Sequence, residues 1–134
     1  MTDHAIATAR SGGLAPRTLF ALDALTCLFM GLLLLAFSDA LGALFGLPPR
    51  LLLVAGLVLL PCAALMYATA RSAGPNRLLG WLVVVGNLAW VLASIAIAAM
   101  LAPPPLGVGF LLAQAAAVAI LAAMEARAMR GPAS

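Results

Sequence analysis

Four long runs of apolar residues dominate the chain and restrict what it can fold into. They cover residues 18–37, 51–70, 78–101 and 106–124, and their lengths are 20, 20, 24 and 19 residues. A helix needs about 20 residues to cross roughly 30 Å of hydrocarbon, so each run is long enough to span a membrane. Because lipid offers the backbone no hydrogen-bond partners, we expect these runs to be helices.

Composition supports the same class of protein. The chain has 134 residues, of which 66% are hydrophobic and 8% are charged, whereas about 25% of the residues of soluble domains are charged. A soluble domain of this size exposes too much surface to hide so many apolar side chains. The sequence predicts an all-α integral membrane protein with four transmembrane helices in an up-down bundle. This domain, residues 18–126, would lie between cytoplasmic tails at 1–17 and 127–134.

Prolines mark two of the expected turns, at positions 48–49 and 103–105. The segment before the first of these prolines, residues 38–50, is too apolar to be a free loop. Ser38 or Asp39 can cap a helix there. We therefore expect a short interfacial helix on the outer side between the first two spans, or an extension of the first span.

The arginines predict the orientation in the membrane. The chain has no lysine, and with four spans only Arg50 falls on the outer side. The other six basic residues share the opposite side: Arg10, Arg17, Arg71, Arg77, Arg127 and Arg130. Cytoplasmic loops are enriched in arginine, so we expect a multi-pass protein of the cell inner (plasma) membrane with both termini cytoplasmic. The charges form no basic stripe with interleaved aromatics, which argues against nucleic-acid binding.

A cleaved signal peptide is the alternative interpretation of the first apolar run. That run is longer than the ~7–15 apolar residues of a signal peptide. It also carries an acidic residue, Asp23. We therefore interpret it as a span.

Polar side chains inside the spans predict a pocket. Helices in lipid associate through close packing and interhelical hydrogen bonds, so polar side chains should face the bundle. At about 1.5 Å per residue, Asp23 and Tyr67 lie near the cytoplasmic boundary, and Asn87 and Gln114 lie near the midplane. If the helix faces that carry these residues converge, the pocket opens toward the cytoplasm. The candidate pocket residues are Asp23, Tyr67, Asn87, Trp90 and Gln114.

Three of these residues also have a purely structural interpretation. Asp23 can pair with Arg71 or Arg77 instead of binding a ligand. Asn87 and Gln114 can form hydrogen bonds between helices, each of which contributes about 0.6 kcal/mol to stability on average.

Other polar and sulfur-containing residues have similar interpretations. Tyr67 can belong to the aromatic belt, and Trp90 can pack in the core. Glu125 is expected at the cytoplasmic interface, although it lies eleven residues after Gln114, close to three helical turns. Cys27 and Cys62 are expected to act as small hydrophobes, with a redox role as the alternative.

Several kinds of chemistry have no support in the sequence. The single histidine, His4, lies outside the spans, and no nucleophile–base pair or glycine-rich phosphate loop is present. We expect no metal and no cofactor, and the sequence favours a protein that is not an enzyme.

Two families of similar size were compared with these features. The small multidrug exporters place a glutamate in the middle of their first helix, whereas Asp23 is shallow. The small fluoride channels carry a Thr/Ser/Phe-rich filter in their third helix, which this chain lacks. The chain is similar to DoxX-type bacterial proteins in topology alone, so no family is assigned.

Three functions remain open at this stage. The favoured one is a non-enzymatic accessory or assembly partner, whose Gly/Ala-rich helix faces bind a second copy or another membrane protein. The alternative is a small transporter or binder of an apolar or cationic molecule, with its pocket around Asp23 and Asn87. A quinone-linked redox enzyme would rest on Asp23 and the two cysteines alone.

Overall fold

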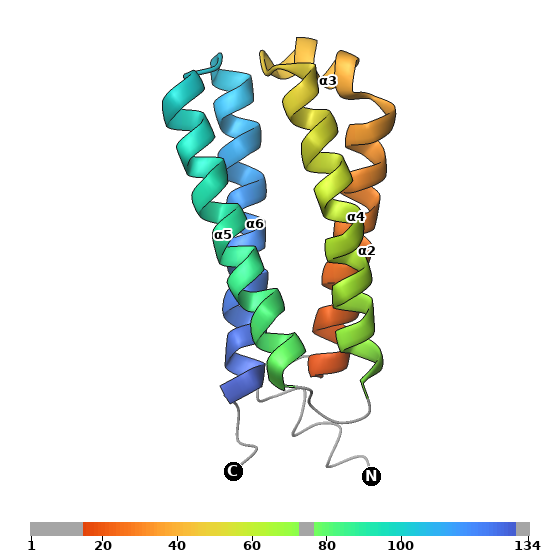
Figure 1. Cartoon of the computed structure of the whole chain (residues 1–134). Coiled ribbons are helices and arrows are strands. Elements are labelled where there is room, and N and C mark those ends of the chain that lie inside the picture. Colours follow the sequence, from red (N-terminus) through yellow and green to blue (C-terminus); the bar gives the residue numbers. More distant parts are fainter. Residues whose placement is uncertain (1–14, 73–76, 131–134) are drawn as a thin grey trace, which may run out of the picture.

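The protein is a bundle of helices (Figure 1). The computed structural model describes residues 15–72 and 77–130. Within these residues, four helices are long and apolar enough to cross a membrane. They are α2 (Pro16–Ala36), α4 (Pro49–Arg71), α5 (Arg77–Leu101) and α6 (Pro105–Arg130), and the short helix α3 (Ser38–Phe45) joins the first two. The predicted all-α membrane bundle is confirmed.

The four long helices alternate in direction. α2 and α5 begin at the end of the molecule where α4 and α6 finish, while α3 lies at the other end (Figure 1). We call this the α3 end, and the other the opposite end. The up-down arrangement and the short helix between the first two spans are therefore as predicted.

The helix boundaries differ slightly from the predicted spans. α2, α4 and α6 begin at or within a residue of a proline, which is well suited to the first turn because it needs no backbone N–H there. The last helix continues beyond residue 124 to Arg130. Residues 125–130 are mostly Ala, Met, Glu and Arg, which are strong helix formers but fall outside an apolar run.

The helices form two hairpins that pack more extensively within themselves than against each other. The first hairpin comprises α2, α3 and α4, and the second comprises α5 and α6. Glycines let α2 and α4 approach closely, since a Cβ atom added to Gly56 would lie 2.9 Å from the carbonyl oxygen of Gly31. Close contact between small residues is a common way for helices to associate in lipid.

At the α3 end the two hairpins are in backbone contact. The rings of Phe45 and Phe110 stack with their centroids 4.3 Å apart. A Cβ atom on Gly107 would collide with the carbonyl oxygen of Phe45, and one on Gly46 would collide with the ring of Pro104. Gly46 also has a positive φ of 66°, which ends α3 in the left-handed conformation.

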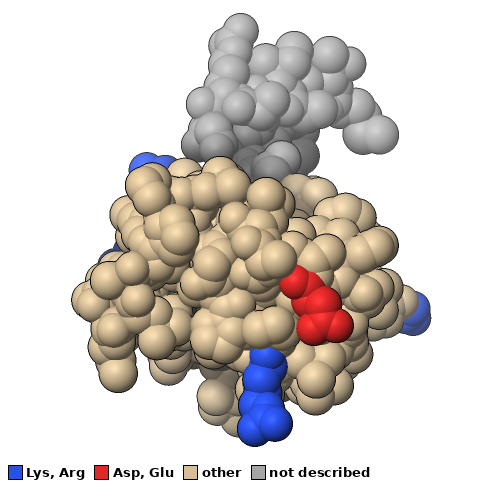
Figure 2. Space-filling model, turned by 90° about the horizontal axis from the view of Figure 1, so that it is seen from above, with Lys and Arg blue, Asp and Glu red and all other residues tan. Residues whose placement is uncertain are grey.

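The outer surface of the bundle is apolar. Large side chains such as Leu25, Phe29 and Leu78 are exposed along the long helices, which fits contact with lipid. Seen from the α3 end, most of the surface is uncharged (Figure 2). The chain is thus a multi-pass membrane protein by the length and apolar character of its helices.

Candidate functional site

Two carboxyl groups meet at one amide where the hairpins join. Asp23 of α2, Asn87 of α5 and Glu125 of α6 are 2%, 5% and 0% exposed. The Nδ2 atom of Asn87 donates to Oδ2 of Asp23 at 2.7 Å and to Oε1 of Glu125 at 2.8 Å. We call these three residues the carboxyl cluster. A single amide nitrogen therefore holds two acidic side chains from different hairpins.

The remaining carboxyl oxygens have little compensation. Oδ1 of Asp23 lies 3.7 Å from Sγ of Cys27, which donates to it. Oε2 of Glu125 has no hydrogen-bond partner, and it is the only such buried side-chain nitrogen or oxygen in residues 15–72 and 77–130. Neither carboxyl group is hydrogen-bonded to an arginine of these residues. The cluster thus carries acidic groups with no cationic partner from the described chain.

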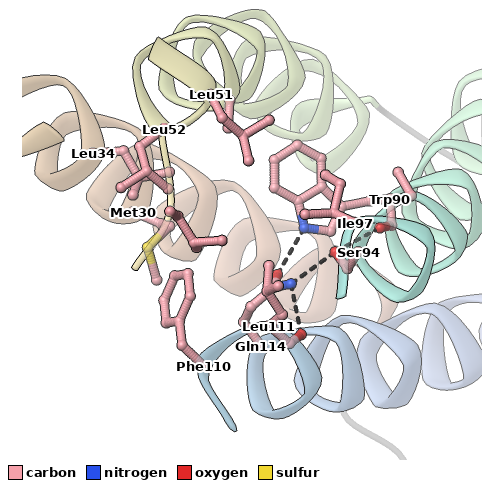
Figure 3. Close-up of a pocket in the computed structure, with 13 residues that line it drawn as sticks. Met30, Leu34, Leu51, Leu52, Trp90, Ser94, Ile97, Phe110, Leu111 and Gln114 are labelled. Carbon is pink, nitrogen blue, oxygen red and sulfur yellow. Dashed lines mark hydrogen bonds between the residues drawn. The ribbon is translucent and has the colours of Figure 1, made fainter. Parts of the chain in front are cut away.

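A second polar cluster lies within the second hairpin (Figure 3). Its residues follow Asn87 in α5 and precede Glu125 in α6, so it lies nearer the α3 end than the carboxyl cluster. Nε1 of Trp90 donates to Oε1 of Gln114 at 2.7 Å, and Nε2 of Gln114 donates to Oγ of Ser94 at 2.7 Å and to the carbonyl oxygen of Leu111 at 2.9 Å. We call Trp90, Ser94 and Gln114 the amide cluster. The amide of Gln114 has partners on both of its polar atoms, so this cluster links α5 to α6 without leaving an unpaired group.

Two small cavities flank Trp90. One, of about 110 Å³, has apolar walls that include Met30, Leu52 and Phe110 (Figure 3). The other, of about 60 Å³, is lined by residues that include Asn87, Cys27 and Cys62. Sites for drug-sized ligands measure about 300–1,000 Å³, so neither cavity is large enough for such a molecule.

The five predicted pocket residues fall into three places. Asp23 and Asn87 are in direct contact. Trp90 and Gln114 are hydrogen-bonded to each other in the amide cluster. Tyr67 is 55% exposed, and its hydroxyl accepts a hydrogen bond from Arg71 at 3.0 Å. It belongs to neither cluster.

Asp23 lacks the arginine partners that the sequence offered as its structural alternative. Arg71 donates to Tyr67, and Arg77 donates to the carbonyl oxygen of Met129 at 3.3 Å. The hydrogen-bond donors to Asp23 are Asn87 and Cys27 instead.

Glu125 is the residue whose position differs most from expectation. It was expected at the cytoplasmic interface, but it is fully buried and hydrogen-bonded to Asn87. The reason is that α6 continues through these positions and presents Glu125 and Gln114 on one face. Their separation of eleven residues was the signal in the sequence.

Known proteins offer no guide to this site. The chain matches no known protein family, no curated protein and no solved structure. Its role has to follow from the fold and from the two polar clusters.

Proposed function

We propose that this protein is a small transporter or binder of a monovalent cation, whose charge is balanced by the carboxyl cluster. The observation that supports this most is the meeting of Asp23 and Glu125 at one amide, both buried and without a cationic partner among the described residues. Ionisable side chains are rare inside membrane spans, and those present commonly mark ion or substrate pathways.

The charge state of the cluster leads to the charge of the ligand. Two carboxylates that share one site are not both ionised, because each disfavours the charge of the other. In this proposal the cluster carries a net negative charge when no ligand is bound. A lone buried charge is destabilising by several kcal/mol. A monovalent cation removes that cost, whereas a neutral ligand does not.

Cavity size favours a small ligand over a large one. The cavity next to Asn87 measures about 60 Å³, well below the range for drug-sized molecules. An ion fits this space, and a quinone or a large apolar molecule does not fit the structure described. This favours the cationic form of the binder predicted from the sequence over its apolar form.

The proposal includes the location and orientation of the protein. Of the arginines in the described residues, only Arg50 lies near the α3 end, where α4 begins. The others lie at or near helix termini at the opposite end: Arg17, Arg71, Arg77, Arg127 and Arg130. By the positive-inside rule we place the opposite end in the cytoplasm, in the inner membrane of a bacterial-type cell.

An accessory or assembly role is the second candidate, and one observation favours it. A Cβ atom added to Gly86 or Gly109 would meet nothing within 4 Å. These exposed positions leave room for a neighbouring helix. Gly86→Leu and Gly109→Leu should then abolish association with a second copy or a partner in crosslinking experiments. A purely structural bundle has no need of two buried acids, so we rank this role second.

Ligand-dependent stability tests the cation-binding role. The protein purified in detergent is heated in nitrate salts of lithium, sodium, potassium or silver, and the unfolding midpoint is measured. A cation that binds the folded state raises stability by about 2.7 kcal/mol at one hundred times its Kd. The double variant Asp23→Asn/Glu125→Gln should need at least tenfold more of the active cation for the same rise.

The exposed acid Asp39 provides the matched control. Asp39→Asn should respond like the wild type, because the carboxylate that it removes lies on α3, outside the carboxyl cluster. The proposal is wrong if no cation raises the wild-type midpoint, or if the double variant responds as strongly as Asp39→Asn.

A further inference from the structure

We infer that the bound cation is a small organic ammonium ion, of the size of methylammonium, held in the cavity of about 60 Å³ that Asn87 and Trp90 line. An N–H group of the ion donates to Asn87, its charge faces Trp90 and the carboxyl cluster, and its methyl group lies against the apolar walls. The inference names the substrate class of the proposed function and so rests on it.

Asn87 connects this cavity to the two acids. Its Nδ2 atom has two N–H groups, and both are used, since one donates to Asp23 and the other to Glu125. Oδ1 is therefore the atom of this side chain that can bind a ligand. An ion held by Oδ1 lies one amide group away from two buried carboxyl groups. The oxygen can accept an N–H group or bind a metal ion, so the other walls decide between them.

Those walls favour an organic cation over an alkali metal ion. Besides Asn87, the lining side chains that are not pure hydrocarbon are Trp90, Met66, Cys27 and Cys62, and none of these four has an oxygen atom. The others are hydrocarbon, apart from Gly86: Leu59, Leu65, Leu82, Val83 and Val118. Potassium filters replace the hydration shell of the ion by rings of carbonyl oxygens, whereas this cavity offers one side-chain oxygen. A methyl group on nitrogen makes use of hydrocarbon walls, and a metal ion does not.

Trp90 adds an attraction for positive charge. It lies three residues after Asn87 on α5 and lines this cavity. Its indole extends into the space between the hairpins, where the hydrogen bond to Gln114 holds it (Figure 3). A cation over the face of an aromatic ring is attracted by the ring, and tryptophan is the most effective of the aromatic side chains. The attraction is stronger where the cation has lost its water, as it must in a cavity with apolar walls.

The volume of the cavity limits the size of the ion. A cavity needs about 10–15 Å³ to hold one water molecule, so the space of about 60 Å³ accommodates a few groups of that size. Methylammonium consists of one such nitrogen and one such carbon group. Long-chain amines and the large dye cations are too big for this space.

The fluorescence of Trp90 tests where the ion binds. The chain has two tryptophans, Trp81 and Trp90, so Trp81→Phe leaves Trp90 as the only one. In detergent at neutral pH, methylammonium nitrate should change the emission of this variant in a saturable way. Trp90→Phe is the matched control. It keeps Trp81, which does not line the cavity, so its emission should stay constant.

A series of cations tests the substrate class. The unfolding midpoint of the wild type is measured in increasing concentrations of the nitrates of methylammonium, potassium and tetramethylammonium. We expect a Kd for methylammonium at least tenfold lower than for potassium, which has no methyl group. We expect the same advantage over tetramethylammonium, which has no N–H group to donate to Asn87.

Variants at Trp90 test the aromatic wall in the same measurement. Trp90→Leu should raise the Kd for methylammonium at least tenfold, and Trp90→Phe, which keeps a ring, should raise it less. Trp81→Leu is the control and should bind like the wild type. Equilibrium dialysis with radiolabelled methylammonium measures binding directly, and circular dichroism without salt shows that each variant is folded.

Three results would overturn the inference. The first is stabilisation of the wild type by sodium or potassium that equals or exceeds that by methylammonium, which would leave the proposed function standing. The second is an equal Kd for methylammonium in Trp90→Leu and Trp81→Leu. The third is an emission of Trp81→Phe that methylammonium does not change. If no cation, methylammonium included, raises the midpoint, the proposed function fails as well.

Discussion

The Nδ2 atom of Asn87 lies 2.7 Å from Oδ2 of Asp23, although 64 positions separate the two residues in sequence. The bond joins the two hairpins, which otherwise pack less closely than their own helices do. Because the same nitrogen also donates to Glu125, loss of Asn87 leaves two buried carboxyl groups without their main donor.

We expect Asn87→Ala to lower the free energy of unfolding by about 2 kcal/mol or more. Each buried acceptor left without a donor costs about 1–3 kcal/mol, which exceeds the average of about 0.6 kcal/mol for an interhelical hydrogen bond in a membrane. Unfolding in sodium dodecyl sulfate, followed by circular dichroism, measures the change. Thr26→Ala is the control, because Thr26 is exposed and bonds only within its own helix. A loss no larger than that of the control would contradict the importance of this bond.

Neutral replacements of Asp23 and Glu125 should destabilise the protein less than Asn87→Ala does. We expect Asp23→Asn and Glu125→Gln to leave the free energy of unfolding unchanged within about 1 kcal/mol or to raise it, because the amide oxygen still accepts from Asn87 and a buried charge is removed. Breaking a buried structural ion pair would instead cost about 3–5 kcal/mol. The same detergent titration separates these outcomes, and a loss in that range would show that a cation of the protein pairs with the acids.

The close approach of α2 and α4 predicts a contrast between two glycines. Gly56→Ala should destabilise the protein by about 1–3 kcal/mol through overpacking, since the new methyl group would lie 2.9 Å from the Gly31 oxygen. Gly86→Ala should be neutral or stabilising by up to about 1 kcal/mol, since nothing lies within 4 Å and alanine favours the helix. Thermal or detergent unfolding of the two variants measures the difference, and equal effects would argue against the packing described.

The hydrogen bonds of the amide cluster predict that replacing Trp90 lowers the free energy of unfolding only modestly. Trp90→Phe removes the donor to Oε1 of Gln114, and we expect a loss of about 0.6–1.7 kcal/mol, the range for such bonds in membranes. Trp81→Phe is the matched control, because Trp81 is also half-buried and has no hydrogen bond to Gln114. The losses of unfolding free energy in the two variants are compared. Equal losses would contradict a stabilising role of the hydrogen bond between Trp90 and Gln114.

Reporter fusions test the orientation. Expressed in a bacterium, green fluorescent protein fused after Ser134 should fluoresce, since that end is predicted to be cytoplasmic. Alkaline phosphatase fused after Arg50 should be active, because that enzyme is active only on the outer side of the membrane. The opposite pattern would contradict the prediction from the arginines.

The sequence was sufficient to predict the architecture. Apolar length and proline breaks set the four spans, because the requirements of lipid on backbone and side chains leave few other solutions. The short helix α3 was also predicted, since the segment after the first span stays apolar. Its expected cap was wrong: the N-cap is Phe37, which makes no side-chain cap hydrogen bond, and Ser38 and Asp39 lie inside the helix. These features depend on local composition, which a single sequence contains.

The polar clusters were predicted less completely. Helical spacing indicates which residues share a face, so the approach of Asn87 to Asp23 was expected. It does not indicate how far a helix continues past its apolar run, and this placed Glu125 at the surface instead of beside Asn87. Nor does it distinguish a belt position from a core position near a boundary, which is why Tyr67 was included.

The backbone contacts at the α3 end give the molecule a mechanical asymmetry. Gly107 touches the backbone of Phe45 and Gly46 touches the ring of Pro104, so the hairpins have no room to slide past each other there. The carboxyl cluster lies farther from the α3 end, and there the hydrogen bond from Asn87 to Asp23 joins the two hairpins. A rotation that separates the two hairpins would therefore have its axis at the α3 end. Its widest displacement would fall at the opposite end, where five of the six arginines in the described residues lie.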